Sequence, residues 1–134
     1  MTRYYSATAQ DTTLTSTMTT SATTMTVSAT TGYPTQYPFI LAVDYNQSAE
    51  ELVSVTGASG LTLTVTRAYN GTTAQNHAVG AVVRHVITAQ DLTDAQNHYA
   101  ATTSVHGIAD TSVLATLSNA TDVSNVTSFL NMGA

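Results

Sequence analysis

An alternating hydrophobic pattern restricts the fold of this chain more than any other feature of its sequence. In the segment 61–66, Leu61, Leu63 and Val65 alternate with three threonines. Strict alternation predicts a β-strand with one buried face and one solvated face. The surrounding region, residues 33–87, has further apolar segments of strand length between Gly, Pro and Asn turns. We therefore expect a mainly β protein, a compact antiparallel β-sandwich or barrel of five or six short strands.

The other expected strands are short apolar segments with a turn on either side. They are Phe39–Val43, Glu51–Thr56 and Ala81–Ile87, with turns at Asp44–Ser48, Gly57–Gly60 and Asn70–Gly71. Phe39–Val43 is apolar throughout, which is typical of a strand covered on both faces. Gly57–Gly60 is expected to form a tight hairpin loop. Arg67, at the end of the alternating strand, is expected to bond backbone carbonyls or to pair with Asp44 or a glutamate.

Residues 1–32 are expected to form a Thr-rich N-terminal arm that contacts other subunits. Apolar residues are sparse there, and the main ones are Leu14, Met18, Met25 and Val27. Two stretches around these residues alternate, which predicts two short strands with one buried face. Low-complexity disorder is the alternative interpretation.

Residues 88–134 are expected to be a helical and extended segment used for assembly. Thr88 followed by Asp91 has the spacing of a helix-capping box. One face of the helix, which should run to about Ala101, then carries Leu92, Ala95, Gln96 and Tyr99. Two shorter helical patterns follow, within 113–117 and 123–130. Because these apolar stripes are thin, we expect the segment to pack against copies of itself or against a host particle.

The composition favours a protein that lies against neighbouring molecules. Only 8% of the residues are charged, against roughly 25% in ordinary soluble domains. There is no lysine, and threonine makes up 28 of the 134 residues. Hydroxyl groups keep a surface wet, yet they are easier to bury at an interface than the charges of Lys or Glu. A secreted bacterial β-domain is the alternative that composition leaves open.

Composition also makes several classes of function improbable. A net charge of −5 without a basic cluster argues against nucleic-acid binding. The chain has no cysteine, so disulfides and thiolate chemistry do not arise. It has no apolar run of the roughly 20 residues that a membrane helix needs. The first residues lack the apolar core of a signal peptide, so we expect synthesis in the cytoplasm.

Several segments resemble a small β-domain found near the N-terminus of virion proteins of tailed bacteriophages. The segments are Tyr37–Tyr45, Glu50–Thr56, Leu61–Ala74, Ala78–Ile87, and the stretch from Asp94–His98 through Val105–Gly107. The resemblance covers about residues 33–108. The proteins that these segments resemble come from phages of Gram-positive, often actinobacterial, hosts. It implies a minor tail or fibre-like protein, located on the virion. In that family a longer repetitive shaft usually follows, whereas this chain stops at Ala134, which raises the expectation of a capsid decoration or head-fibre role.

No constellation in the sequence predicts a catalytic, cofactor-binding or metal site. The four histidines, His77, His85, His98 and His106, show no recognised metal-ligand spacing. The alternative is a metal site formed between subunits, in which a trimer brings three copies of His98 or His106 to its axis and binds an ion there. Glu50 and Glu51 should point to opposite faces of a strand, and Asp91 and Asp94 suit the start of a helix. We therefore expect no enzymatic activity and no cofactor.

The leading hypothesis is an accessory virion protein that forms a homo-oligomer, a trimer in the simplest case, and binds major capsid or tail proteins. All seven tyrosines are possible contact residues, with ordinary core and rim positions as the alternative. The interface candidates are Tyr4, Tyr5, Leu92, Tyr99, Val105, Ile108, Leu114, Phe129 and Leu130. A receptor- or glycan-binding module at the tail tip, with exposed tyrosines and Asp44 as its site, is the second hypothesis. A wall-degrading domain is the third.

Overall fold

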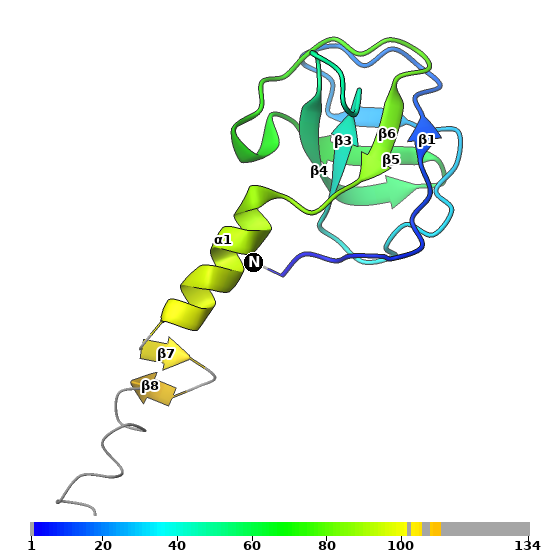
Figure 1. Ribbon diagram of the computed structural model, residues 1–134. Coiled ribbons are helices and arrows are strands. Elements are labelled where there is room, and N and C mark those ends of the chain that lie inside the picture. Colours follow the sequence, from blue (N-terminus) through cyan, green and yellow to red (C-terminus); the bar gives the residue numbers. More distant parts are fainter. Residues whose placement is uncertain (1, 102, 106–107, 111–134) are drawn as a thin grey trace, which may run out of the picture. The chain divides into compact units, whose positions relative to one another are not determined.

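The computed structural model describes residues 2–101, 103–105 and 108–110 (Figure 1). The chain divides into two compact units, Met1–Gln90 and Asp91–Ala134. The first unit contains one antiparallel sheet of six strands that curls into a half-barrel, so the expectation of a mainly β fold is confirmed. The strands are β1 (Thr12–Thr13), β2 (Thr24–Thr26), β3 (Phe39–Val43), β4 (Glu51–Ser59), β5 (Thr62–Thr66) and β6 (Val82–His85), in the order β1-β6-β3-β4-β5-β2. A sandwich of two facing sheets is not confirmed.

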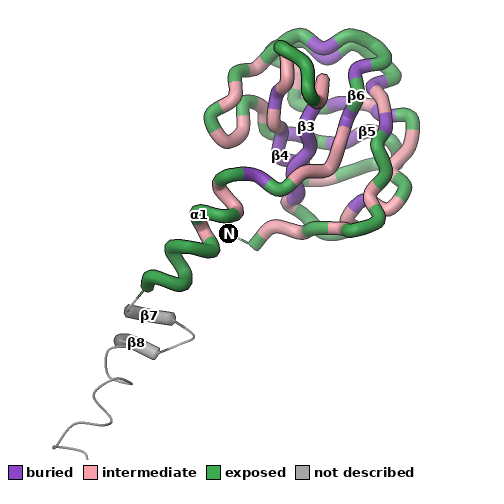
Figure 2. Tube along the Cα trace, viewed as in Figure 1, coloured by how far each residue is buried: buried purple, intermediate pink, exposed green. Residues whose placement is uncertain are grey.

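Strand β3 lies between β4 and β6 inside the sheet, as its continuous apolar sequence predicts. All five of its residues are buried, and Figure 2 shows the buried positions along β3 and β4. Side chains from β2 to β6 and from the segments next to these strands meet in one core. Its members are Leu14, Met18, Met25, Val27, Tyr33, Phe39, Leu41, Val43, Val53, Val55, Leu63, Val65, Ala81 and Val83.

The β4–β5 hairpin differs from the sequence prediction at its turn. Strand β4 continues through the expected loop to Ser59, and a register shift between Val55 and Gly57 marks a β-bulge. The turn consists of Gly60 and Leu61, with Gly60 at a positive φ of 61°. Leu61 is therefore exposed at the turn, and the prediction that it points inward with the other apolar residues of its strand is wrong.

Residues 1–32 are not confirmed as a separate arm. Their apolar residues Leu14, Met18, Met25 and Val27 are buried in the core, and the contacts of the chain group this segment with the β-domain. Leu14 and Val27 form a bridge that joins the first and last strands of the curled sheet. The Thr15 amide also donates to the Thr26 carbonyl at 2.9 Å. The two strand-like stretches thus pair with each other at the edges of the curled sheet, and their apolar side chains complete the core.

The predicted helix forms at the expected place. α1 (Ala89–Ala100) begins directly after Thr88, the predicted capping residue, and a short 3₁₀ turn, η1 (Tyr69–Gly71), covers the predicted Asn70–Gly71 turn. In the second unit, β7 (Thr103–Val105) pairs with β8 (Ile108–Asp110) in antiparallel register. The helical patterns predicted within 113–117 and 123–130 lie outside the described residues. No helix among the described residues is long and apolar enough to cross a bilayer.

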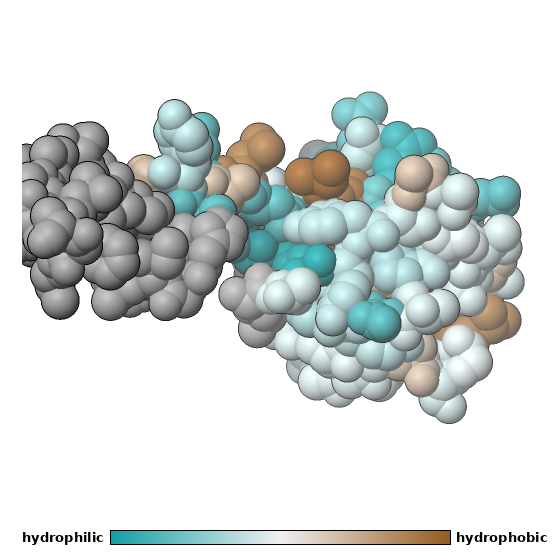
Figure 3. Space-filling model, turned by 90° about the horizontal axis from the view of Figure 1, so that it is seen from below, coloured by the Kyte–Doolittle hydropathy of each residue, from teal (hydrophilic) through white to brown (hydrophobic). Residues whose placement is uncertain are grey.

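The surface of the protein reflects its threonine content. Figure 3 shows one face on which many residues have pale colours near the middle of the hydropathy scale, with several strongly hydrophilic residues and a few hydrophobic patches among them. Apart from Thr12, which is buried, the threonines on the outer side of β5 and around the first strands are exposed or half-buried. Hydroxyl groups thus replace much of the charged shell that a soluble domain ordinarily carries.

Candidate functional site: a buried charged cluster and an aromatic pocket

Four ionisable side chains meet at one end of the sheet and form what we call the charged cluster: Asp44, Glu51, Arg67 and His77. Asp44 directly follows β3, Glu51 begins β4, and Arg67 directly follows β5. The register pairs Val43 with Glu51. In antiparallel neighbours the end of one strand lies beside the start of the next, so three of the four residues are brought together by strand order alone.

Glu51 is the centre of the charged cluster and is fully buried. Its Oε1 accepts hydrogen bonds from Arg67 Nε at 2.8 Å and the Ala68 amide at 2.9 Å. Its Oε2 accepts from Arg67 Nη2 at 2.6 Å, the Gln75 amide at 2.9 Å and His77 Nε2 at 2.9 Å. Burial alone would raise the pKa of Glu51, but these hydrogen bonds, led by those of Arg67, lower it to about 2. Glu51 is thus held as a carboxylate.

Arg67 connects Glu51 to the neighbouring loops. Besides its paired bonds to the carboxylate, its guanidinium donates to the carbonyl oxygens of Thr19, of Ala22 at 3.3 Å and of Gln75 at 2.6 Å. The expectation that Arg67 bonds backbone carbonyls and pairs with a glutamate is confirmed, and Asp44 is not its partner. The planar guanidinium can make all these bonds at once because it has five donors in a fixed arrangement.

His77 completes the charged cluster from the loop that precedes β6. Its ring is fully buried, with Nδ1 2.7 Å from Asp44 Oδ2 and Nε2 2.9 Å from Glu51 Oε2. Its backbone amide and carbonyl both bond Met18. Both carboxylate contacts are complete hydrogen bonds only when each ring nitrogen carries a hydrogen. Both ring nitrogens are engaged by carboxylates, so the cluster holds the loop of His77 against strands β3 and β4.

The other two histidines that the structure describes, His85 and His98, do not join this cluster. His85 Nδ1 lies 2.9 Å from the Ile40 carbonyl oxygen, while its Nε2 accepts the Ser6 amide at 3.2 Å. His98 is exposed on α1, and His106 lies outside the described residues. Across the described residues, no group of three or more His, Asp or Glu side chains is arranged to hold a metal ion.

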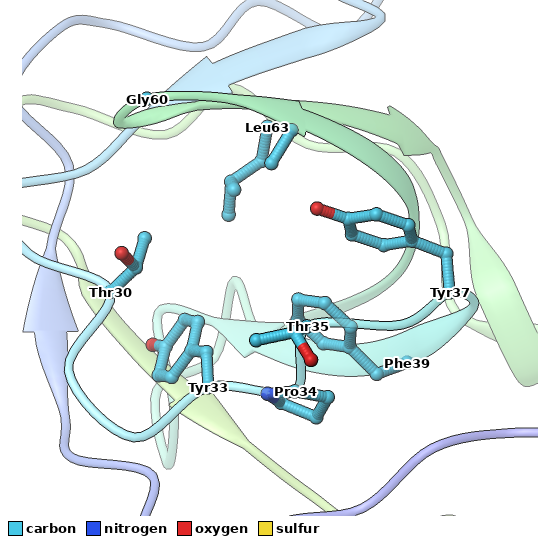
Figure 4. Close-up of a pocket in the computed structure, with 9 residues that line it drawn as sticks. Thr30, Tyr33, Pro34, Thr35, Tyr37, Phe39, Gly60 and Leu63 are labelled. Carbon is cyan, nitrogen blue, oxygen red and sulfur yellow. The ribbon is translucent and has the colours of Figure 1, made fainter.

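A second feature of the first unit, which we call the aromatic pocket, lies between the 30–39 segment and the β4–β5 hairpin (Figure 4). Its volume is about 300 Å³ and its lining consists of Thr30, Tyr33, Pro34, Thr35, Tyr37, Phe39, Ala58, Gly60 and Leu63. The rings of Tyr37 and Phe39 stack at 5.8 Å between centroids, and Tyr33 meets Phe39 edge-on at 6.0 Å. Burial, together with the charge of Asp11, raises the pKa of Tyr33 to about 12, so its hydroxyl stays neutral.

The predicted interface residues fall in both units. Tyr4 is half-buried and its amide bonds the Pro38 carbonyl, whereas Tyr5 is exposed beside the His85 ring. Leu92 and Tyr99 lie on α1 with 63% and 93% of their surface exposed. Val105 and Ile108 are paired across β7 and β8. Leu114, Phe129 and Leu130 lie outside the described residues.

Compared with known proteins, the chain matches no family model and no curated protein sequence. Sequence reasoning found no metal-ligand spacing for His77 and did not foresee the charged cluster. The signal that could have found part of it is the position of Asp44, Glu51 and Arg67, each at or next to the end of a strand. The aromatic pocket had a weaker signal, the repeated Tyr-Pro pairs of 33–38.

Proposed function

We propose that this protein is a non-enzymatic structural component of a bacteriophage particle that works by assembling symmetrically with copies of itself, in the simplest case as a trimer. The observation that carries the proposal is the apolar stripe of α1. No residue of α1 is buried within the described structure, although Leu92 and Tyr99 are large apolar side chains. A 12-residue helix is marginal in water by itself. Burial of this stripe against other molecules would stabilise it.

The spacing of the stripe favours copies of the same chain as the partner. Leu92, Ala95 and Tyr99 are separated by three and then four residues, which is the spacing of positions a, d and a in a heptad. Such a narrow seam suits a helix that packs against identical helices around an axis. The stripe from Leu92 to Tyr99 spans only about two helical turns and can bury little area in a single contact. A symmetric oligomer makes the same contact several times, which adds up the small contributions.

Two further observations support a place on a virion. The sequence resemblance of residues 33–108 points to tailed-phage proteins, and the weakly charged, hydroxyl-rich surface suits close contact with other proteins. On this proposal the protein is an accessory component of the particle exterior, as a capsid decoration protein, head fibre or minor tail protein. It would be made in the host cytoplasm and would bind major capsid or tail proteins.

The neighbours of the gene test the proposal. We expect the gene to lie within a block of virion genes. A position next to the major capsid gene would indicate decoration, and one after the tape-measure gene would indicate the tail. A gene surrounded by metabolic genes, together with a protein that does not bind purified phage capsids or tails, would contradict the proposal.

A second candidate function, recognition of a host receptor or glycan at the tail tip, is favoured by the aromatic pocket. Asp44 was expected to contribute to such a site. It lies instead in the charged cluster, at the opposite end of β3 from Phe39 of the pocket. Any such recognition would therefore use the pocket tyrosines without Asp44.

A further inference from the structure

The aromatic pocket combines an apolar floor with a hydroxyl-bearing rim. Tyr33, Phe39 and Leu63 are buried and form the floor, while Tyr37 and Thr35 are exposed at the rim. In Figure 4 the Tyr37 side chain directs its hydroxyl into the cavity. Within the described part of the chain, that hydroxyl has no hydrogen-bond partner. The pocket therefore offers a ligand both aromatic rings to pack against and hydroxyl groups that can form hydrogen bonds.

We propose that the aromatic pocket binds a neutral sugar, as a single pyranose ring of a larger glycan or as a free monosaccharide. One face of a pyranose carries C–H bonds with slight positive charge, which suits the negative face of an aromatic ring. Its edge carries hydroxyls, which can exchange hydrogen bonds with Tyr37, Thr35 and Thr30. The pocket thus presents both kinds of surface that such a ring needs.

The charge and size of the pocket narrow the ligand class. None of the nine lining residues is charged, so the pocket has no group that would pair with a phosphate, a carboxylate or an amine. Its volume of about 300 Å³ lies at the lower end of the range for small-molecule sites. A neutral ring meets both conditions, whereas a charged or much larger ligand does not.

This inference deepens the second candidate function and does not depend on assembly through α1, because every lining residue belongs to the first unit, Met1–Gln90. Its failure would leave the proposed structural role untouched. Conversely, a chain that stays monomeric could still bind a sugar in this pocket. The two proposals are therefore separated by separate measurements on the same full-length protein.

The test is an NMR titration of the isotope-labelled full chain with glucose, galactose and N-acetylglucosamine. We expect at least one sugar to shift the amide signals of Tyr33, Tyr37 and Gly60 saturably, with a Kd in the range of about 1–10 mM. Tyr37→Ala should weaken binding about tenfold, because it removes ring and hydroxyl together. Tyr37→Phe, which keeps the ring, should weaken it less.

Two further variants make the result decisive. Tyr5→Ala removes an exposed tyrosine outside the pocket and should leave binding unchanged. Ala58→Gln, on the exposed part of β4, should obstruct the cavity while leaving its aromatic rings in place. The proposal is overturned if none of the three sugars gives saturable shifts, or if Tyr37→Ala and Ala58→Gln bind like the native chain. Tighter binding of hexaproline than of any sugar would also overturn it, since that would assign the pocket to a peptide.

Discussion

Arg67 and Glu51 share two parallel hydrogen bonds, of 2.8 and 2.6 Å, between the end of β5 and the start of β4. The side chain of Glu51 is fully buried, and that of Arg67 is only 9% exposed. Every donor and acceptor of the buried side chains described has a partner. A buried ion pair is a source of stability only when its hydrogen bonds are complete. Here they are complete, and they join two strands to the loops at Thr19 and Gln75.

Removing the charge of Glu51 should destabilise the protein strongly. Glu51→Gln replaces one acceptor oxygen by an amide that donates toward Arg67 or His77, which leaves buried donors without a partner. We expect the free energy of unfolding to fall by about 3–5 kcal/mol. Urea denaturation measures the change. Glu50→Gln is the matched control, since the Glu50 side chain is partly exposed and accepts a hydrogen bond from the Asn46 amide. This variant should cost about 1 kcal/mol or less. Equal losses in the two variants would contradict a central role for Glu51.

The stability of the first unit should decrease steeply in acid. The pKa of Glu51 is about 2 in the folded protein, below its ordinary value of 4.5. The stabilisation is therefore fully present above pH 4.5 and is lost as the pH falls toward 2, to a total of about 3 kcal/mol. Urea midpoints measured between pH 5 and pH 2 follow this loss. In Glu51→Gln the urea midpoint should change less steeply with pH, whereas in Asp11→Asn the pH dependence of the midpoint should stay close to that of the native chain. An unchanged slope in Glu51→Gln would show that other carboxylates cause the acid sensitivity.

Gly32 should tolerate substitution worse than another glycine of similar backbone conformation. Its φ is +72°, and a Cβ added there would lie 2.1 Å from the Thr8 carbonyl oxygen. Gly60 has a φ of +61°, but a Cβ there would meet nothing within 4 Å. We expect Gly60→Ala to cost about 1 kcal/mol for backbone strain and Gly32→Ala about 2–3 kcal/mol, because the clash adds to the strain. Equal costs by thermal denaturation would mean that the Thr8 segment does not pack against Gly32.

The body of the fold could be predicted from the sequence because its patterns have a local cause. Phe39–Val43 is apolar throughout and is buried on both faces, and the alternation of Leu63 and Val65 with threonine matches one buried face. Positive φ angles at Asn70 and Gly71 match the predicted turn. The helix pattern after Thr88 was also sufficient to place α1. Each of these features depends on residues close together in the chain.

The rest depends on contacts between distant residues, which periodicity does not reveal. Leu14 and Val27 were expected on short strands of an N-terminal arm, yet they are buried in the core because their segments pair and close the sheet. His77 is 33 residues from Asp44 and 26 from Glu51, so no sequence spacing indicated the charged cluster. Leu61 was misassigned because the β-bulge moved the hairpin turn. These features follow from strand order and register, which a single sequence does not determine.

Self-association through α1 is the central claim, and sedimentation velocity of the full chain tests it most directly. We predict one discrete species with about three times the 14.0 kDa mass of a single chain, persisting as the protein is diluted to about 10 μM. The double variant Leu92→Ser/Tyr99→Ser should shift this species to the monomer, because each lost apolar contact costs about 1.5–3 kcal/mol. Its β-sheet circular dichroism should stay native. A native chain that sediments as a monomer up to about 0.5 mM, with α1 still helical, would contradict the account.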